Sequence, residues 1–292
     1  MLTKSDPSRV TVVTVSFNSL RVLPAMLASL PNRVATVIVD NGSADSGALK
    51  ALAAAHGARL ILNPENRGFG AACNQGAAGI ETEFFLFLNP DTVLGAGAIS
   101  ELVAAIDRFP EAAAMNPRIE NAEGGPDFKR GSVLLPRSDW LPRGWPAEDC
   151  DLPVLSGAAL FVRRSAFEVV QGFDPAIFLY HEDDDLSLRL KARCGKLMFI
   201  RAAVVMHQGG GSSIRSPEVA ALKAWHMGRS RVYAMRRHGR PMAFAGALIS
   251  ALVQVVSPAV LLSRRKRAKQ VAFLHGVLSA RTDASLKPEI AR

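Results

Sequence analysis

The amino-acid sequence predicts an α/β protein built on a mostly parallel β-sheet flanked by helices. Over residues 10–91, short β-branched or aromatic runs alternate with stretches of helical apolar spacing, which is the pattern of a parallel sheet. The run Phe84–Leu88 is wholly apolar and ends in Asn89-Pro90-Asp91. Such a run is typical of a central strand buried on both faces, and Pro90 ends it because proline has no N–H to donate. With 49% hydrophobic residues, the 292-residue chain can bury a large core.

Each element follows from its residues. The first strand is predicted at 10–15, where β-branched residues dominate. The polar stretch Ser16-Phe17-Asn18-Ser19 follows it. Three more strands are expected at 34–39, 60–62 and 84–88, with helices between them at 20–30, 49–56 and 71–78. The second half is expected to add buried strands at 155–162, 198–200 and 204–206, and then a long helix at 219–237.

The charge and the cysteines narrow the class of protein. The net charge is +9, from 35 basic and 26 acidic residues, which indicates a nucleotide, a lipid head group or a nucleic acid as an anionic partner, or only a basic surface. The three cysteines form no Cys-x-x-Cys pair, so a disulfide framework and a zinc site are not expected. Residues 1–9 contain no apolar signal-peptide core. These features favour a reducing, cytoplasmic location.

Three predicted strands end in polar residues that we expect to meet at one edge of the sheet. They are Ser16 and Asn18, Asp40 and Asn41, and Asn89 and Asp91. Ligands bind at this edge in open α/β sheets, and a carboxylate there suits a divalent cation held against a diphosphate. Each motif alone has a simpler interpretation. Residues 40–43 are typical of a turn with a helix cap, and residues 66–70, with Gly68 and Gly70, are typical of a tight loop or of close backbone approach to a ligand.

Four short motifs follow one another in the first half of the chain. They are Val15-Ser16-Phe17-Asn18, Asp40-Asn41-Gly42-Ser43, Asn66-Arg67-Gly68-Phe69 with Asn74, and Asn89-Pro90-Asp91. In order and spacing they resemble the family 2 glycosyltransferases, and within these the bacterial rhamnosyltransferase-like branch of cell-surface polysaccharide synthesis. The resemblance covers about residues 10–213. It implies a GT-A fold, a dTDP- or UDP-linked sugar donor, and a divalent cation (Mn²⁺ or Mg²⁺), with no nucleic acid partner.

The resemblance also implies which residues hold the donor. Asp40 would contact the nucleotide base, and the whole expected nucleotide-sugar-binding set is Ser16, Asn18, Asp40, Asn41, Asn66, Gly68, Asn74 and Asn89. Asp91 stands at the metal position, and His207 would complete that site. The family's Asp-x-Asp pattern appears as Asn89-Pro90-Asp91, so one carboxylate is replaced by an amide. A histidine with a carboxylate suits Mn²⁺ better than Mg²⁺, and the glycines at 209–211 would turn backbone amides toward phosphate oxygens.

Four consecutive acids, Glu182-Asp183-Asp184-Asp185, form the second chemical cluster. The simpler interpretation is an acidic first turn of a helix, with Asp185 paired to Arg189 at i, i+4. The apolar approach at 178–180 indicates instead that Glu182 and Asp183 are carried into the protein. By resemblance Asp183 is the catalytic base, and Glu182, the rival candidate, orients the acceptor. Ser156 and Gly157 are expected beside the acceptor. The basic stretch at 116–152 either meets an acceptor phosphate or is a solvated loop.

We divide the chain into a GT-A domain at 1–216, with a nucleotide half at 10–91 and an acceptor half at 92–216, and a C-terminal helical segment at 217–292. Residues 241–263 carry no charge and are followed by Arg264-Arg265-Lys266-Arg267. We favour an interfacial helix or hairpin on the inner face of the plasma membrane. A spanning helix and a buried or homodimer-forming helix remain open.

These features together predict an inverting, metal-dependent glycosyltransferase of cell-surface glycan synthesis. It would move a sugar, with rhamnose as a candidate, from a nucleotide-diphosphate donor to a lipid-linked or polysaccharide acceptor. Two other classes remain open: a nucleotidyltransferase on a similar fold, and a non-catalytic membrane scaffold. A nucleotidyltransferase usually has a glycine-rich, basic loop after the first strand, where this chain has Ser16-Phe17-Asn18-Ser19.

Overall fold

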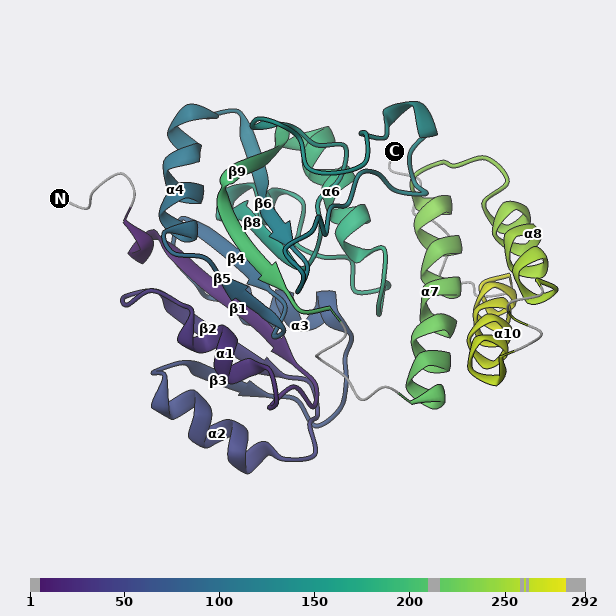
Figure 1. The fold of residues 1–292 in the computed structure, drawn as a ribbon, viewed down its shortest axis with the longest axis horizontal. Helices are drawn as coiled ribbons and strands as arrows, with labels where there is room; N and C mark the ends of the chain where they lie inside the picture. The colour runs from purple at the N-terminus through teal and green to yellow at the C-terminus, as the bar shows by residue number, and fades with distance from the viewer. Residues whose placement is uncertain (1–5, 210–215, 258–259, 261–262, 282–292) are drawn as a thin grey trace.

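The computed structural model describes residues 6–209, 216–257, 260 and 263–281. The described residues form one nine-stranded sheet in the order β3-β2-β1-β4-β8-β6-β9-β5, with β7 paired to β9. Helices cover both faces of the sheet, and a group of long helices stands beside one end of it (Figure 1). The mostly parallel α/β architecture predicted from the sequence is therefore present.

The first half of the chain is a parallel α/β unit. Its strands are β1 (Val10–Ser16), β2 (Ala35–Asp40), β3 (Arg59–Leu62) and β4 (Phe84–Leu88). Its helices are α1 (Leu23–Ala28), α2 (Ser46–Ala55) and α3 (Phe69–Ala77). All of its strand pairs are parallel, and Ser16 lies level with Asp40. The carboxyl ends of these strands therefore share one edge, as the alternation in the sequence predicted.

The second half closes the sheet with mixed pairing. It contains strands β5 (Thr92–Leu94), β6 (Ala112–Glu120), β7 (Cys150–Asp151), β8 (Ala159–Arg163) and β9 (Lys196–His207). Its helices are α4 (Ala98–Arg108), α5 (Arg164–Val169) and α6 (Glu182–Arg193), and two short 3₁₀ turns lie at Pro7–Arg9 and Arg137–Asp139. β8 runs antiparallel to β4 and β6, whereas β6 and β9 are parallel.

Two strand predictions in this half need correction. The strand expected at 155–162 begins only at Ala159, and the preceding residues form a loop at the edge of the sheet. The two strands expected at 198–200 and 204–206 are one strand, β9. A register shift opposite Pro117 and Arg118 takes up the extra residues between them. Such a bulge bends a strand without ending it.

β4 occupies the centre of the sheet and is buried on both faces, as its apolar run predicted. Successive side chains of Phe84–Leu88 alternate between a cluster with α1, α2 and α4 and a cluster with α3, α5 and α6. Phe87 contacts Phe167 and Phe173, with ring centroids 5.2 and 5.3 Å apart. Burial of a side chain of this size stabilises the fold by about 1.5–3 kcal/mol. This packing fixes the position of β4 and therefore of Asn89-Pro90-Asp91, which follow it at the carboxyl edge of the sheet.

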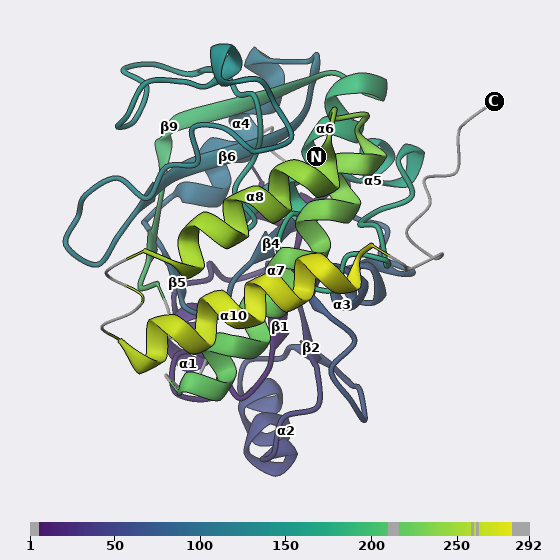
Figure 2. The ribbon, with the colours of Figure 1, turned by 90° about the vertical axis from the view of Figure 1, so that its right-hand side faces the viewer.

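Three further helices pack as a unit: α7 (Pro217–Arg237), α8 (Ala243–Val255) and α10 (Arg264–Ser279). α8 and α10 lie side by side across α7 (Figure 2). α7 and α10 approach so closely that a Cβ on Gly228 or Gly276 would collide with the backbone of the facing helix. Their core includes Leu134 and Ile177 from the rest of the chain, so the helical unit is joined to the sheet domain by apolar packing.

The uncharged stretch at 241–263 is not one continuous helix. α8 ends at Val255, and Pro258 lies outside the described residues. Among the residues described, none of the helices combines the length and apolar character needed to cross a bilayer.

Candidate active site

A cleft of about 440 Å³ opens at the carboxyl edge of β1, β2 and β4. Its walls come from the ends of these strands, the loop before β8, the turn before α6, and the first half of α7. Ten of the residues singled out from the sequence line it: Asn18, Asn41, Asn66, Gly68, Asn89, Ser156, Gly157, Glu182, Asp183 and His207. The structure thus brings the donor motifs and the acidic cluster into one cavity.

Asn41, directly after β2, holds one wall of the cleft together. Its side-chain oxygen accepts hydrogen bonds from Asn63 Nδ2 (3.1 Å) and Arg67 N (3.2 Å). Its amide nitrogen donates to Asn66 Oδ1 (3.0 Å) and Gly68 O (3.1 Å). A carboxamide can satisfy four partners in this way because it carries two donors and two acceptor lone pairs. Asn41 therefore fixes the loop at 66–68 against the strand end.

Gly68 in that loop and Gly70 at the start of α3 leave space for another segment of the chain. Gly68 has φ of +87°, and a Cβ there would collide with the carbonyl oxygen of Phe178. A Cβ on Gly70 would meet the Phe173 side chain. Phe69 N also donates to Phe178 O (3.0 Å). These glycines admit the 173–178 segment, so the close approach that the sequence suggested for a ligand is used by the chain.

Four predicted site residues do not line the cleft: Ser16, Asp40, Asn74 and Asp91. The Asp40 carboxylate is buried and accepts hydrogen bonds from Ser43 N (3.1 Å) and Ser43 Oγ (2.5 Å). Asn74 donates to Phe173 O and accepts from Phe173 N, both at 2.8 Å. In this arrangement Asn74 anchors the loop before α6 and does not line the cleft, where the sequence-based prediction had placed it.

Asp91 and His207 are neighbours because β5 and β9 pair side by side. Thr92 lies opposite His207, and Asp91 O accepts a hydrogen bond from Gln208 N (2.9 Å). His207 Nε2 stands 3.4 Å from Asp91 Oδ1, and His207 Nδ1 is 2.6 Å from Asp127 Oδ2. The hydrogen bonds to Asp127 and then Asp91 raise the pKa of His207 to about 9.

This donor set fits a divalent cation that takes its remaining ligands from the substrate. The Asp91 carboxylate and His207 Nε2 lie 3.4 Å apart, and Asp127 contacts the other ring nitrogen, which is the support that metal-binding histidines commonly have. No group of three or more potential protein ligands is assembled for a metal in the part of the chain that is described. Mn²⁺ and Mg²⁺ commonly bind to one or two side chains plus phosphate oxygens. Gly210 and Gly211, expected to face the phosphates, lie outside the described residues.

The acidic cluster begins α6 directly after a strained turn. Tyr180 and His181 have φ of 66° and 68°, a left-handed conformation that disfavours residues with a Cβ. Glu182 follows, nearly buried, and no hydrogen-bond partner for its Oε2 lies in the described residues. Burial and the neighbouring charge of Asp183 raise the pKa of Glu182 to about 8. Glu182 therefore holds a proton near neutral pH.

Asp183 is held as a carboxylate acceptor. Its Oδ2 accepts from Gly157 N (2.9 Å) and lies 2.6 Å from Lys129 Nζ. The same ammonium is 2.8 Å from Asp184 Oδ1. Burial raises the pKa of Asp184, but Lys129 and the hydrogen bond from His181 outweigh it and leave that pKa below its usual range. One lysine thus forms ion pairs with two adjacent acids.

Sequence reasoning missed several contributors to this cleft. Asp127 and Lys129 stand two residues apart between β6 and β7, where Asp127 contacts His207 and Lys129 contacts Asp183. α7 adds Lys223 and His226 to the wall, and the His226 ring stacks on Phe178 at 4.2 Å. For 116–152 the sequence left open whether its basic residues meet an acceptor phosphate or form a solvated loop, and for 219–237 it predicted a helix without placing that helix at the site.

The sequence is similar to those of known proteins, which indicates that the chain shares a common origin with them. The model of the family described as glycosyl transferase family 2 matches residues 11–170. An N-acetylglucosaminyl-diphospho-decaprenol L-rhamnosyltransferase of Mycobacterium tuberculosis is 30% identical over 303 aligned positions, which cover 90% of this chain and 98% of that protein. A pre-mycofactocin glycosyltransferase of the same species is 28% identical, covering 85% of this chain and 53% of that protein.

Solved structures share the fold at low sequence identity. A mannosyltransferase from Pyrobaculum calidifontis, in complex with GDP-Man and Mn²⁺, has a TM-score of 0.56 and 15% identity, covering 94% of this chain and 88% of that one. GalNAc-T7 with UDP, GalNAc and Mn²⁺ has a TM-score of 0.56 and 18% identity; 81% of this chain matches about half, 51%, of that chain. These neighbours carry the GT-A fold, which the α/β sheet described above shares. The chain belongs to glycosyl transferase family 2 and has the glycosyltransferase GT-A fold.

Proposed function

We propose that this glycosyltransferase moves a sugar, with rhamnose as the first candidate, from a dTDP- or UDP-linked donor to a lipid-linked acceptor in cell-surface glycan synthesis, and that it inverts the anomeric centre. The observation that carries this proposal is the joining of the donor motifs and the Glu182–Asp183 pair in one cleft. The similarity to a rhamnosyltransferase whose name specifies a decaprenol-linked acceptor supports the sugar and the acceptor class.

At the donor end, Asn18 and Asn66 would bind the nucleotide, and Asn41 would hold the loop at 66–68 in place beside it. Asp91 and His207 would hold a divalent cation, with Mn²⁺ favoured by the imidazole ligand. When bound there, it offsets the negative charge that develops on the leaving diphosphate. Asp127 keeps the His207 ring in place through its Nδ1 contact at 2.6 Å, which leaves Nε2 directed at the site.

At the acceptor end, Asp183 would act as the base. The acceptor hydroxyl attacks the anomeric carbon from the face opposite the diphosphate, and the bond between that carbon and the diphosphate oxygen breaks. The proton of the hydroxyl passes to the Asp183 carboxylate. Glu182, which keeps its own proton near neutral pH, would orient the acceptor by a hydrogen bond. Ser156 and Gly157 border the same space.

The test is product analysis with a panel of dTDP- and UDP-sugars and a polyprenyl-diphosphate-linked N-acetylglucosamine acceptor, with and without Mn²⁺. We expect transfer from a single donor and, by NMR, an anomeric configuration opposite to that of the donor. Retention of configuration would contradict an Asp183 base. Transfer of a nucleotidyl group would favour the nucleotidyltransferase alternative, and activity in excess chelator would remove the cation from the mechanism.

We also propose that α8 docks the enzyme on anionic membrane at the cytoplasmic face. Small residues of α8, Ala243, Ala247 and Ala251, face the helical unit and are buried. Large apolar residues at i, i+3, i+4 and i+7 point outward, and their exposed fractions run from 49% to 68%: Ile249, Leu252, Val253 and Val256. α10 begins with the basic run at 264–267. An apolar face beside basic residues suits an anionic lipid surface.

Flotation with vesicles containing phosphatidylserine tests this docking. The wild type should float at low salt, and replacement of Arg264, Arg265, Lys266 and Arg267 by Gln should reduce flotation, since each basic residue near the surface adds about 1 kcal/mol. Vesicles of neutral lipid are the matched control. A protein that binds neither vesicle but sediments as a dimer would assign the α8 face to a second copy.

A further inference from the structure

The segment from Asp174 to Asp185 delivers the acidic pair to the cleft, and its conformation is not one the segment favours by itself. It contains two consecutive left-handed residues, Tyr180 and His181, just before Glu182. Non-glycine residues persist in this region of φ/ψ space only where surrounding contacts hold them. The second half of α7 supplies several of those contacts, and it lies outside the residues matched by the family model.

α7 forms a hydrogen bond and an ion pair with Asp174, at the start of the segment. The Tyr233 hydroxyl donates to Asp174 Oδ2 (2.7 Å), and Arg237 Nη1 lies 3.1 Å from the same oxygen. Asp174 Oδ1 in turn accepts from Ala176 N (2.9 Å). Further along, Ser230 Oγ donates to Leu179 O (2.9 Å), immediately before the two left-handed residues.

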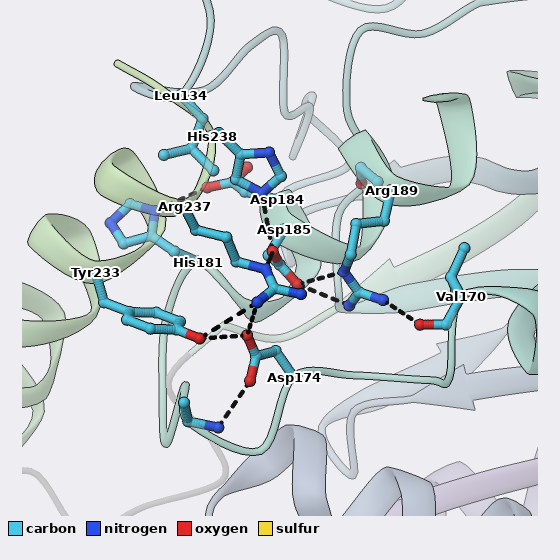
Figure 3. Close-up of polar contacts among 12 residues, drawn as sticks. Leu134, Val170, Asp174, His181, Asp184, Asp185, Arg189, Tyr233, Arg237 and His238 are labelled. Atoms are coloured by element: carbon cyan, nitrogen blue, oxygen red, sulfur yellow. Dashed lines mark hydrogen bonds and ion pairs between the residues drawn. The ribbon is translucent and has the colours of Figure 1, made fainter. Parts of the chain in front are cut away.

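α7 also forms an ion pair with Asp185, which ends the segment in the first turn of α6. The Asp185 carboxylate is fully buried. Its Oδ1 is 3.1 Å from Arg237 Nε and 2.8 Å from His238 Nε2, while Oδ2 accepts from Arg189 Nε (2.8 Å). The Arg189 pair was expected from the i, i+4 spacing, whereas the partners at the C-terminal end of α7, Arg237 and His238, were not. Figure 3 shows Arg237 between the two carboxylates, reaching both.

We propose that Arg237 is a positioning residue for catalysis: by bridging Asp174 and Asp185 it fixes both ends of the segment and so sets where Glu182 and Asp183 stand. This inference rests on the proposed function for its catalytic consequence. The planar guanidinium suits the task, because its N–H groups diverge in a fixed fork and can serve two carboxylates at once.

The neighbouring residue provides a matched control. Arg236 points to the other side of α7, where its Nη1 donates to Ala280 O (2.7 Å) after α10 and its guanidinium lies over the Phe244 ring. Arg236→Met therefore removes an arginine from the adjacent position of the same helix without touching the segment. Arg237→Met leaves Asp185 its contacts with Arg189 and His238, so the variant is expected to fold. Tyr233→Phe, which removes one hydroxyl, is a milder second variant.

The first measurement is hydrogen–deuterium exchange of amides 178–185 in each full-length variant. We expect Arg237→Met to speed their exchange about tenfold or more relative to wild type, and Arg236→Met to leave it unchanged. Tyr233→Phe should give a smaller change in the same direction. Equal exchange in Arg237→Met and wild type would overturn the proposal, whatever the activity of the enzyme.

The second measurement is steady-state transfer, which separates positioning from general destabilisation. We expect Arg237→Met to lower kcat about tenfold or more with the KM for the donor unchanged, because a small displacement of a catalytic group slows the reaction strongly. Arg236→Met should keep the wild-type kcat. If Arg237→Met keeps it too, the catalytic half of the inference is wrong. A wild type that transfers no sugar would contradict the proposed function. The exchange data would still show whether Arg237 holds the segment in place.

Discussion

Glu182→Gln offers a sharp test of the electrostatics at the acidic turn, because it replaces a titrating group by an isosteric amide at a nearly buried position. Burial and the Asp183 charge raise the pKa of Glu182 from 4.5 to about 8 in the folded protein. Between these two values the folded chain keeps the proton and the unfolded chain loses it. The wild type should therefore lose stability as pH rises through this window, by about 1.4 kcal/mol per pH unit.

The glutamine variant has no proton to lose at this position. We therefore expect its free energy of unfolding, relative to wild type, to improve steadily from pH 5.5 to pH 7.5, by about 1.4 kcal/mol per unit. All other charges are common to both proteins, so the difference isolates Glu182. Urea unfolding at constant ionic strength measures it, and Glu168→Gln on α5, at an exposed position, gives the effect of the same chemical change at the surface. A difference that does not vary with pH would refute the reasoning.

Three further predictions concern neighbours of the cleft. Lys129→Met should lower the free energy of unfolding by about 2–3 kcal/mol. This is less than the loss of about 3–5 kcal/mol expected when a fully buried ion pair is broken, because a quarter of the Lys129 side chain is exposed. An unchanged urea midpoint would count against the two ion pairs. Asp127→Asn should weaken Mn²⁺-dependent nucleotide binding in calorimetry by about tenfold or more, and unaltered binding would show that the His207 ring needs no such support. Gly68→Ala should lower the thermal midpoint, since a Cβ has no room beside Phe178 O and φ is +87°; a midpoint equal to wild type would mean that this loop shifts freely.

The parallel half of the fold was predictable because its signals are local. A β-branched run followed by a polar exit and a helical stretch specifies each strand–helix unit with no knowledge of distant residues. The parallel arrangement then carries Asn18, Asn41 and Asn89 to one edge, where the structure places them in the cleft. The apolar run at Phe84–Leu88 likewise identified the central strand.

The rest of the site depends on contacts that a single sequence does not encode locally. Asp127 and Lys129 reach their partners across about 80 and 54 residues of chain, and no spacing rule links such positions. Asn74 illustrates the reverse: its motif fits a ligand contact, yet its amide is used by the backbone of Phe173. The helix at 219–237 was expected to belong to the C-terminal helical segment at 217–292, whereas its tertiary packing makes α7 a wall of the cleft.

The central claim, that Asp183 is the base of a glycosyl transfer, is tested most directly by comparing Asp183→Asn and Glu182→Gln in one assay. Turnover is measured with saturating donor and acceptor, and donor affinity is measured separately by calorimetry. We predict that Asp183→Asn lowers turnover by about 10² or more while the donor binds as it does to wild type. If Asp183→Asn turns over normally and only Glu182→Gln loses activity, the base is Glu182 and the account is wrong.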